Sequence, residues 1–374
     1  MSEPTSPITQ QPFIKMFWRR LIVGAGLALF FTWLALRNPQ PVDAELAQRS
    51  FEAMGTQIDL VIALPKAADA ENDSRARAET VLDAVQQQLE RYAQRWSAWG
   101  EGAQLSNLNQ QLARGEAIAI PEPMQGLFAR AAQISALSGG RFDVRVGKLV
   151  ALWGFDDVSH FRSAPPDAAA IDAAVAELAR APALNTDGTR YGPAPQVWLD
   201  FGAIAKGDAS DLAIEHIAQA GFDSAMVNLG GNLRVMGQRS DRPWRVGIRH
   251  PRPELGQRLL ATLQTQGNEA IVTSGDYEHY FESGGVRYHH LLDPKTGQPA
   301  SSLQSVTVVT GDGTLADAAS TALFVAGAQN WRSTARALGI DQVLVVDAQG
   351  QVLVTEALAA RAVFPPEITA QTVP

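Results

Sequence analysis

The chain has 374 residues, with 39 acidic side chains against 31 basic ones and a formal net charge of −8. This acidic balance argues against a nucleic-acid binder, which normally presents a basic face, and 46% hydrophobic against 19% charged residues argue against disorder over most of the chain. The absence of cysteine excludes a disulfide framework, cysteine-ligated zinc, an iron–sulfur cluster, a cysteine nucleophile and a lipid attached to cysteine.

The first 44 residues have the pattern of an export signal. A polar stretch ends in Lys15, Arg19 and Arg20, and an apolar run at 21–36 follows it. This order of a basic n-region and a hydrophobic h-region is typical of a signal peptide, and the run is slightly short for a transmembrane helix of about 20 residues. We therefore predict that residues 1–44 form a cytoplasmic n-region with either a cleaved signal peptide or a membrane anchor.

Two export routes fit this segment equally well. The adjacent Arg19 and Arg20 and the long n-region fit a twin-arginine signal, and they also fit an ordinary Sec signal that contains two arginines. Cleavage would follow Ala44, whereas an uncleaved segment would keep its basic flank in the cytoplasm. Both routes predict a protein on the periplasmic side of the bacterial inner membrane, either exported or N-terminally anchored.

The remainder of the chain reads as a mixture of helices and short strands. Helical spacing of apolar residues predicts helices at 74–96, 123–137, 167–180, 208–220 and 316–326. Apolar runs predict strands at 57–64, 197–200, 224–228, 233–236, 245–248, 259–264 and 305–309, and a closing hairpin at 342–346 and 352–355. Because there is no regular βαβ alternation and no GxGxxG after a strand, a Rossmann domain is not supported. We predict an α+β fold, with one domain at 45–364 and a loose tail at 365–374.

The segment 199–208 (LDFGAIAKGD) places small residues and a lysine between an apolar run and a helix. Small residues let a ligand approach the backbone, the helix N-terminus favours an anion, and Lys206 adds a positive charge. This pattern is compatible with a phosphate cradle. Taken by itself, however, the segment fits better an ordinary strand–turn–helix that carries a solvated lysine.

The segment 228–232 (NLGGN) puts two glycines between two predicted strands. The simplest interpretation is a tight hairpin turn. The functional alternative is a wall of bare backbone against which a flat ligand packs.

Polar residues are also concentrated at 273–277 (TSGDY) and 288–297 (YHHLLDPKTG). A histidine here could serve as a general base, because its unperturbed pKa is near 6.5. The segment 293–297 also has the composition of a β-turn, which could position that histidine. A zinc site formed by His289 and His290 is disfavoured, because neighbouring residues of a strand point to opposite faces.

The predicted helix at 316–326 carries Asp317 and Thr321 four residues apart, so their oxygens lie on one face. A carboxylate and a hydroxyl suit Mg²⁺, a hard cation, with water and phosphate oxygens completing its shell. The alternative is structural: Asp317 would cap the helix, and Thr321 would bond to a backbone carbonyl.

In this order, the segments resemble the ApbE family, the FAD:protein FMN transferases. The resemblance runs from about Phe51 to Gly327 and also takes in 54–56 (MGT), 138–143 (SGGRFD) and 152–155 (LWGF). Each motif is weak by itself, and the number, order and spacing of the motifs make the joint match strong.

The resemblance implies an exported α+β enzyme with mixed sheets flanked by helices, whose catalytic domain spans 45–364. It would bind FAD and Mg²⁺ and transfer FMN from FAD to a Thr or Ser hydroxyl of an exported or membrane-bound electron-transfer flavoprotein, with release of AMP. Two alternatives stay open. One is an FAD pyrophosphatase that yields FMN and AMP, and the other is a non-catalytic flavin carrier or assembly factor.

The resemblance also assigns residues. It implies contacts with FAD by Met54, Trp99, Arg141, Phe142, Asp143, Asp200, Lys206 and Leu291. It implies metal ligands at the backbone carbonyl of Ala203 and at the side chains of Asp317 and Thr321, with His290 as the candidate base and Lys206 as a second catalytic group. Trp99 stands where the family often has a tyrosine that stacks on the isoalloxazine, and Asp208 replaces a common aromatic residue.

The chemistry of these residues agrees with the resemblance. An alcohol would displace AMP from a diphosphate, so Mg²⁺ and Lys206 would neutralise phosphate charge. A threonine hydroxyl is a poor nucleophile at pH 7, which makes a base such as His290 useful. No covalent enzyme intermediate is needed, in keeping with a chain without cysteine.

Overall fold

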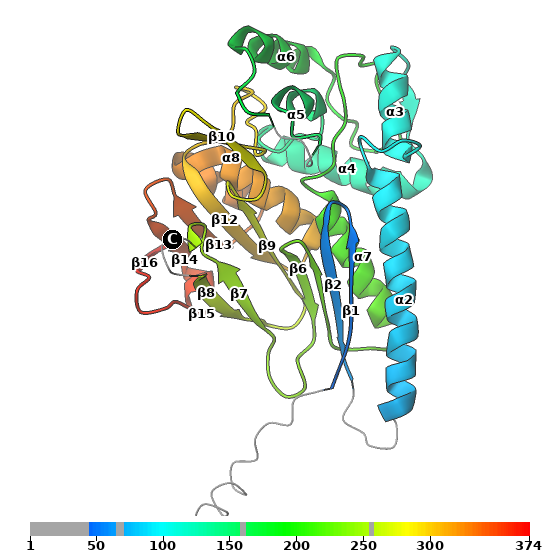
Figure 1. The fold of residues 1–374 in the computed structure, drawn as a ribbon, viewed down its shortest axis with the longest axis vertical. Coiled ribbons are helices and arrows are strands. Elements are labelled where there is room, and N and C mark those ends of the chain that lie inside the picture. The colour runs from blue at the N-terminus through cyan, green and yellow to red at the C-terminus, as the bar shows by residue number, and fades with distance from the viewer. Residues whose placement is uncertain (1–44, 65–70, 158–161, 254–257) are drawn as a thin grey trace, which may run out of the picture. The chain divides into compact units, whose positions relative to one another are not determined.

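A nine-stranded sheet forms the centre of the described chain (Figure 1). The structure is a computed structural model, and it describes residues 45–64, 71–157, 162–253 and 258–374. The segment predicted to carry the export signal, 1–44, lies outside the described residues. Within them, no helix combines the length and apolar character needed to cross a membrane.

The strands of the large sheet are antiparallel to their neighbours, except at one end where β14 and β16 run parallel. In spatial order they are β1 (Leu46–Ala53), β2 (Thr56–Ala63), β5 (Ala225–Leu229), β6 (Asn232–Met236), β9 (Glu269–Gly275), β12 (Leu303–Thr310), β13 (Gln342–Asp347), β14 (Val352–Thr355) and β16 (Ala370–Val373).

Both faces of this sheet are covered, which explains why strands such as β2 read as nearly continuous apolar runs. Side chains alternate between the faces of a strand. Ile58, Leu60 and Ile62 therefore join the hydrophobic core on one face, whereas Val61 and Ala63 join a second core on the other face.

Three helices cover the first face: α2 (Glu71–Trp96), α7 (Ala205–Gln219) and α8 (Gly313–Ala337) (Figure 1). The helices α7 and α8 meet at two glycines. A Cβ atom added to Gly207 would lie 2.1 Å from the carbonyl oxygen of Gly313. This close approach places the first turn of α7 directly beside the first turns of α8.

A three-stranded sheet packs on the second face. Its order is β15 (Ala362–Val363), β8 (Leu259–Gln264) and β7 (Arg245–Arg249). Buried residues of these strands, together with Trp244, share a core with the large sheet. The short helix α9 (Glu356–Ala359) follows β14 and contributes Leu358 to this core.

The remaining elements gather at one end of the large sheet (Figure 1). They are α3 (Gln104–Ala113), β3 (Ile118–Ala119), α4 (Glu122–Leu137), α5 (Gly147–Trp153), α6 (Ala168–Arg180), β4 (Arg190–Tyr191), β10 (Tyr280–Ser283) and β11 (Val286–His289). A third hydrophobic cluster, which includes Trp153 and Phe281, joins α5 and α6 to the β10–β11 hairpin. The indole N–H of Trp153 donates to the carbonyl oxygen of Gly297 at 2.7 Å, which ties the turn at 293–297 to this cluster.

The predicted strand at 197–200 is wrong. This segment forms only an isolated bridge between Val146 and Trp198. The side-chain amide of Asn109 takes the backbone hydrogen bonds of Leu199, because its Oδ1 accepts from Leu199 N at 2.7 Å and its Nδ2 donates to Leu199 O at 2.9 Å. Asp200 N donates to the carbonyl oxygen of Val144. The segment is extended and fixed, but its partners are a side chain and a loop rather than a strand.

The predicted loose tail at 365–374 is also wrong. Residues Ala370–Val373 form β16 and extend the large sheet beside β14. Val373 is buried in the core on the helical face, and Ala370 packs against the core on the other face. The alternation that makes a buried edge strand is present in this segment but is too short to be recognised next to two prolines.

Candidate functional site

A cavity of about 780 Å³ lies where the large sheet meets the helical end of the fold. Its walls come from the β1–β2 turn, the end of α2, the start of α7, the end of β9, the β10–β11 hairpin and the first half of α8. The structure brings together every residue that the resemblance assigned to FAD, to the metal or to catalysis. These residues, which all line the cavity, are Met54, Trp99, Arg141, Phe142, Asp143, Asp200, Ala203, Lys206, His290, Leu291, Asp317 and Thr321. The individual roles of these residues stay predictions.

Asp317 lies at the contact between α7 and α8. Its Oδ2 accepts the backbone N–H of Gly207 at 2.9 Å. It does not cap α8, because the cap is Asp312, whose side chain accepts from Leu315 N. The expectation that Asp317 caps its own helix is therefore wrong, and the carboxylate instead holds the first turn of α7. Its second oxygen accepts no hydrogen bond from the described part of the chain.

The hydrogen bond between Gly207 and Asp317 also leaves the carbonyl oxygen of Ala203 without its usual helical donor. In a regular helix the N–H of Gly207 would donate to this oxygen, four residues earlier. Because that N–H donates to Asp317 instead, the Ala203 carbonyl accepts no hydrogen bond from the residues that the structure describes. The cavity is thus lined by a carbonyl and by a carboxylate that each have an oxygen without a hydrogen bond from the described residues.

Thr321 follows Asp317 by one turn of α8, and its hydroxyl lies 3.3 Å from that of Ser274 at the end of β9. Ser274 also lies 2.8 Å from the hydroxyl of Ser320. The donor set of carboxylate, hydroxyl and backbone carbonyl consists entirely of oxygens, as Mg²⁺ prefers. Among the described residues no group of three histidine, aspartate or glutamate side chains could hold a metal, so a cation here would take its other ligands from water or phosphate.

Lys206 lies in the first turn of α7, which begins three residues earlier than predicted. Its Nζ donates to the carbonyl oxygen of Gly202 at 2.9 Å, and Gly202 N donates to Oδ1 of Asp200 at 2.8 Å. Burial raises the pKa of Asp200, while hydrogen bonds from the Gly202 backbone and the Trp99 side chain oppose this rise. The turn thus presents a cation beside a helix N-terminus, an arrangement that favours anions.

His290 is fixed by the β10–β11 hairpin. Its backbone N–H donates to the carbonyl oxygen of His279 at 3.1 Å, and its Nδ1 lies 3.3 Å from the same oxygen. Because a carbonyl can only accept, Nδ1 carries the proton, and Nε2 of the neutral ring keeps its lone pair. Burial and the neighbouring His279 and His289 lower the pKa of His290 to about 3, so the ring is neutral at pH 7.

The adjacent His289 has a different environment, as strand alternation predicts. Its Nε2 donates to the carbonyl oxygen of Ala300 at 2.8 Å, its Nδ1 accepts from Leu291 N, and the side chain is buried. The turn that follows has the predicted form, with Gly297 N donating to the carbonyl oxygen of Asp293 at 2.7 Å. His289 therefore serves the structure, while His290 faces the cavity.

Three of the predicted flavin contacts are already engaged by other parts of the protein. Asp143 is buried, and its carboxylate binds the guanidinium of Arg145, with a shortest distance of 2.6 Å. The ring of Phe142 belongs to the core. Arg141 donates to the carbonyl oxygen of Ser138 at 3.0 Å. Asp143 and Phe142 therefore line the cavity, but their main contacts are with Arg145 and with the hydrophobic core.

Met54 has an unusual backbone conformation. It occupies the first position of the two-residue β1–β2 turn with a φ of 54°, and Gly55 follows with a φ of 70°. Such hairpin turns normally carry Asn, Asp or Gly at both positions. A methionine with positive φ costs stability, and residues of this kind often occur at functional sites.

Sequence reasoning missed two residues of this region, His279 and Trp198, and it gave Ser274 no role of its own within the segment 273–277. His279 reaches the cavity because the hairpin register pairs Tyr280 with His289 and so sets His279 opposite His290. Trp198 stacks on Trp99 with ring centroids 5.3 Å apart and planes at 16°. The only sequence signal for Trp198 was its place next to the 199–208 motif.

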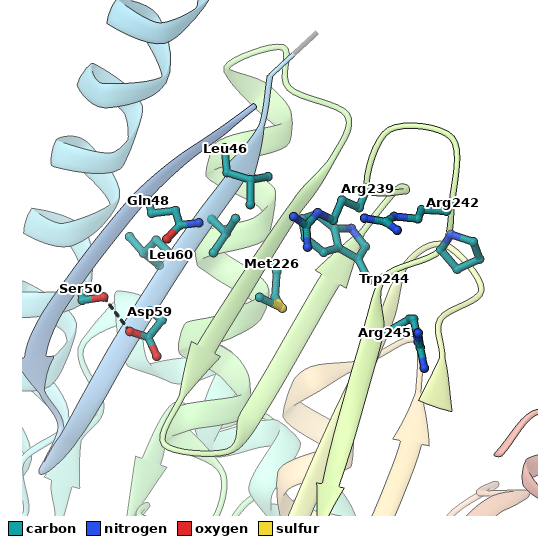
Figure 2. A pocket seen from close by; sticks show the side chains of 12 residues that line it. Leu46, Gln48, Ser50, Asp59, Leu60, Met226, Arg239, Arg242, Trp244 and Arg245 are labelled. Atoms are coloured by element: carbon teal, nitrogen blue, oxygen red, sulfur yellow. Dashed lines mark hydrogen bonds between the residues drawn. The ribbon is translucent and has the colours of Figure 1, made fainter. Parts of the chain in front are cut away.

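A second cavity, of about 550 Å³, lies between β1, β2 and β5 and the loop that leads to β7 (Figure 2). Arginines 239, 242 and 245 and the buried Trp244 contribute to its lining. Asp59, the one carboxylate among the described residues that line it, accepts from Ser50 at 2.7 Å and from Gln57 at 3.0 Å. None of the residues predicted to be catalytic or to bind a ligand lines this cavity.

Comparison with known proteins points to one family. The model of the ApbE family matches residues 54–344. An FAD:protein FMN transferase of Rhodobacter capsulatus is 36% identical over 346 residues, which cover 91% of this chain but only 62% of that protein. An FAD:protein FMN transferase of Vibrio cholerae is 32% identical over 310 residues, which cover 81% of this chain and 88% of that protein.

Solved structures agree with these sequence matches. The crystal structure of the ApbE protein from Thermotoga maritima aligns with a TM-score of 0.73 at 28% identity, covering 85% of this chain and 99% of that one. The flavin transferase ApbE from Vibrio cholerae aligns with a TM-score of 0.70 at 26% identity, again over 85% and 99%. These alignments confirm the mixed α and β fold that the sequence predicted.

Proposed function

Because the chain belongs to the ApbE family, we propose that it is an FAD:protein FMN transferase. The enzyme takes FAD as substrate, joins the FMN half to a hydroxyl of an acceptor protein and releases AMP. The observation that carries this proposal is the single cavity that contains a candidate base, a lysine at a helix N-terminus and an all-oxygen donor set. Its volume of about 780 Å³ lies within the range for sites that bind large organic ligands.

The reaction is a displacement at the phosphorus of the FMN half. A bond forms between the acceptor's hydroxyl oxygen and this phosphorus, and the bond from phosphorus to the bridging oxygen breaks. The bridging oxygen leaves with AMP. The hydroxyl proton goes to the Nε2 atom of His290, whose lone pair is held available by the bond between Nδ1 and the His279 carbonyl.

The residues around Asp317 fit Mg²⁺. Asp317, Thr321 and the carbonyl of Ala203 would hold it, and when bound it would neutralise negative charge on the diphosphate. Lys206 and the first turn of α7 contribute further positive potential to the leaving phosphate. These groups already have their positions in the folded chain, so the side chains need to move little during the reaction.

The acceptor and the compartment are inferred from the sequence. An acceptor hydroxyl from Thr or Ser suits a reaction that needs a general base. The basic and apolar segments within 1–44 support an enzyme at the periplasmic side of the inner membrane, acting on an exported or membrane-bound electron-transfer flavoprotein.

The test uses the full-length protein with FAD, Mg²⁺ and a panel of candidate flavoprotein domains. AMP is followed by chromatography, and covalent flavin on the acceptor is followed by in-gel fluorescence. AMP together with a labelled acceptor supports the transferase. AMP with no label on any acceptor favours the pyrophosphatase, and tight FAD binding with neither product favours a carrier.

A further inference from the structure

Two tryptophans stack at the wall of the candidate site. The rings of Trp99 and Trp198 are nearly parallel, with planes at 16° and centroids 5.3 Å apart. They come from distant parts of the chain, because Trp99 follows the C-terminus of α2 and Trp198 precedes the 199–208 motif. Of the two, Trp99 lines the cavity.

Trp198 is held in place by several contacts. Its indole N–H donates to the carbonyl oxygen of Ala98 at 3.2 Å, and its own carbonyl oxygen accepts from Gly147 N at 2.9 Å. A Cβ atom on Gly147 would lie 2.8 Å from Cδ1 of Trp198, so this glycine lets the ring pack directly on the start of α5. The side chain of Asn109 forms hydrogen bonds with both the backbone N–H and the carbonyl oxygen of the next residue, Leu199. The Trp198 ring is therefore a rigid element.

Trp99 has the opposite character. It lies in a turn and is 36% exposed, which makes it one of the few large apolar side chains on the described surface. Trp198 covers one face of its ring, and a side-chain hydrogen bond joins it to Asp200. With one face covered and one edge fixed, the ring presents its second face as a stacking surface.

We propose that Trp198 is a positioning residue for the flavin subsite. It holds the ring of Trp99 in place, so that Trp99 forms a preformed platform for the isoalloxazine ring. This inference rests on the proposed function, because it takes FAD as the ligand of the cavity. It adds a residue that makes no contact with FAD and acts only through Trp99.

The physical reason lies in conformational entropy. An exposed side chain in a turn samples several rotamers, and fixing it when a ligand binds costs part of the binding free energy. A ring that is already stacked has lost this freedom during folding. Aromatic pairs gain about 0.5–1.5 kcal/mol beyond the burial of area, which corresponds to an about two- to tenfold effect on affinity.

The experiment measures FAD binding to the full-length protein by the quenching of flavin fluorescence. The variants are Trp198→Leu, which removes the ring, and Trp198→Phe, which keeps a ring but loses the bond to Ala98. ADP, which has no isoalloxazine, is titrated as a competitor in parallel. Trp244→Leu is the matched control, because its indole N–H also donates to a carbonyl at 3.2 Å but lies on the other face of the sheet.

We expect Trp198→Leu to weaken FAD binding about three- to tenfold and to reduce the quenching at saturation, with ADP affinity unchanged. Trp198→Phe should restore most of the loss, and Trp244→Leu should bind FAD like the wild type once a thermal melt shows that it is folded. Equal FAD affinity in Trp198→Leu and wild type would overturn the inference. A parallel loss of ADP affinity would also overturn it, since Trp198 would then support the whole cavity.

The proposed function fails in a different way. Wild-type protein that binds FAD with Trp198-dependent quenching but neither releases AMP nor labels an acceptor would contradict the transferase while supporting the platform. Wild-type protein that binds no FAD would contradict both.

Discussion

The carboxylate of Asp317, on α8, contacts the first turn of α7 with one oxygen and lines the cavity. One oxygen accepts the N–H of Gly207, which frees the Ala203 carbonyl, and the other oxygen remains available in the cavity. The residue is buried, and a buried carboxylate is costly unless it is hydrogen-bonded or binds a cation. A bound divalent cation would satisfy the remaining oxygen.

Asp317→Asn should therefore reduce Mg²⁺-dependent release of AMP from FAD by at least about a hundredfold, while the protein stays folded because the amide oxygen can still accept from Gly207. The measurement is AMP release as a function of Mg²⁺ concentration. Asp312→Asn is the matched control, since Asp312 caps the same helix but lies outside the cavity. Unchanged Mg²⁺-dependent turnover in Asp317→Asn would remove the metal assignment.

The lowered pKa of His290 predicts how the free energy of unfolding depends on pH. Its pKa is lowered to about 3 in the folded protein by burial and by His279 and His289, against about 6.5 in the unfolded chain. Between these values the unfolded chain binds a proton that the folded ring does not, so the free energy of unfolding falls as the pH drops from 6.5 toward 3.

Replacing His290 by Asn should remove this contribution. We expect the wild type to lose about 2–3 kcal/mol more stability than His290→Asn between pH 7 and pH 4.5, measured by urea unfolding at both pH values. His216→Asn, on α7 and outside the cavity, controls for the loss of a histidine. The same pH dependence in His290→Asn and wild type would show that the ring titrates normally.

At the scale of elements, the contact between α7 and α8 sets Asp317 beside the first turn of α7. Gly207 lies where a Cβ atom would come within 2.1 Å of Gly313 O and 2.7 Å of the Asp317 Cβ. Both the carbon–oxygen and the carbon–carbon distance are shorter than non-bonded heavy atoms tolerate. The two helices can therefore keep this separation only with glycine at position 207.

Gly207→Ala should push α8 away from α7, destabilise the protein by about 1–3 kcal/mol and lower AMP release even where the protein is folded. Gly126→Ala is the matched control in α4, because no atom lies within 4 Å of the added Cβ; there, alanine should be neutral or slightly stabilising. Chemical denaturation and AMP release are measured on both variants. Wild-type stability and turnover in Gly207→Ala would mean that the helices have room to separate.

At the scale of the whole molecule, the large sheet extends to the last residues of the chain. The strand β16 adds to β14 in parallel, and Val373 enters the core under the helices. No residue of 365–374 lines the candidate cavity, so the tail supports stability without touching the site.

Val373→Ala should therefore cost about 1–3 kcal/mol of stability and leave FAD affinity unchanged at a temperature where the protein is folded. The exposed Gln371 of the same strand provides the control, because Gln371→Ala should change stability by less than about 0.5 kcal/mol. Thermal unfolding and an FAD titration decide the matter. If both variants melt like the wild type, the tail does not contribute to the core.

The amino-acid sequence by itself determined most elements of the fold and the membership of the family. Local patterns suffice for this purpose: helical spacing predicted α2, α4 and α6, and apolar runs predicted β2, β5 and β8. The motifs that carry the resemblance are also local, and the match of the family model to residues 54–344 confirms that together they identify the ApbE family. The charge balance and the absence of cysteine needed no structure at all.

Only the tertiary structure decided how the site is assembled. Gly207 and Asp317 are 110 residues apart in the chain, so no local pattern could show that their bond frees the Ala203 carbonyl. The proton position on His290 follows from the register of a hairpin, and the stack of Trp99 on Trp198 follows from the packing of α2 against a distant loop. The segments 197–200 and 365–374 were mispredicted for the same reason, because side-chain clamps and edge pairing depend on partners that are remote in sequence.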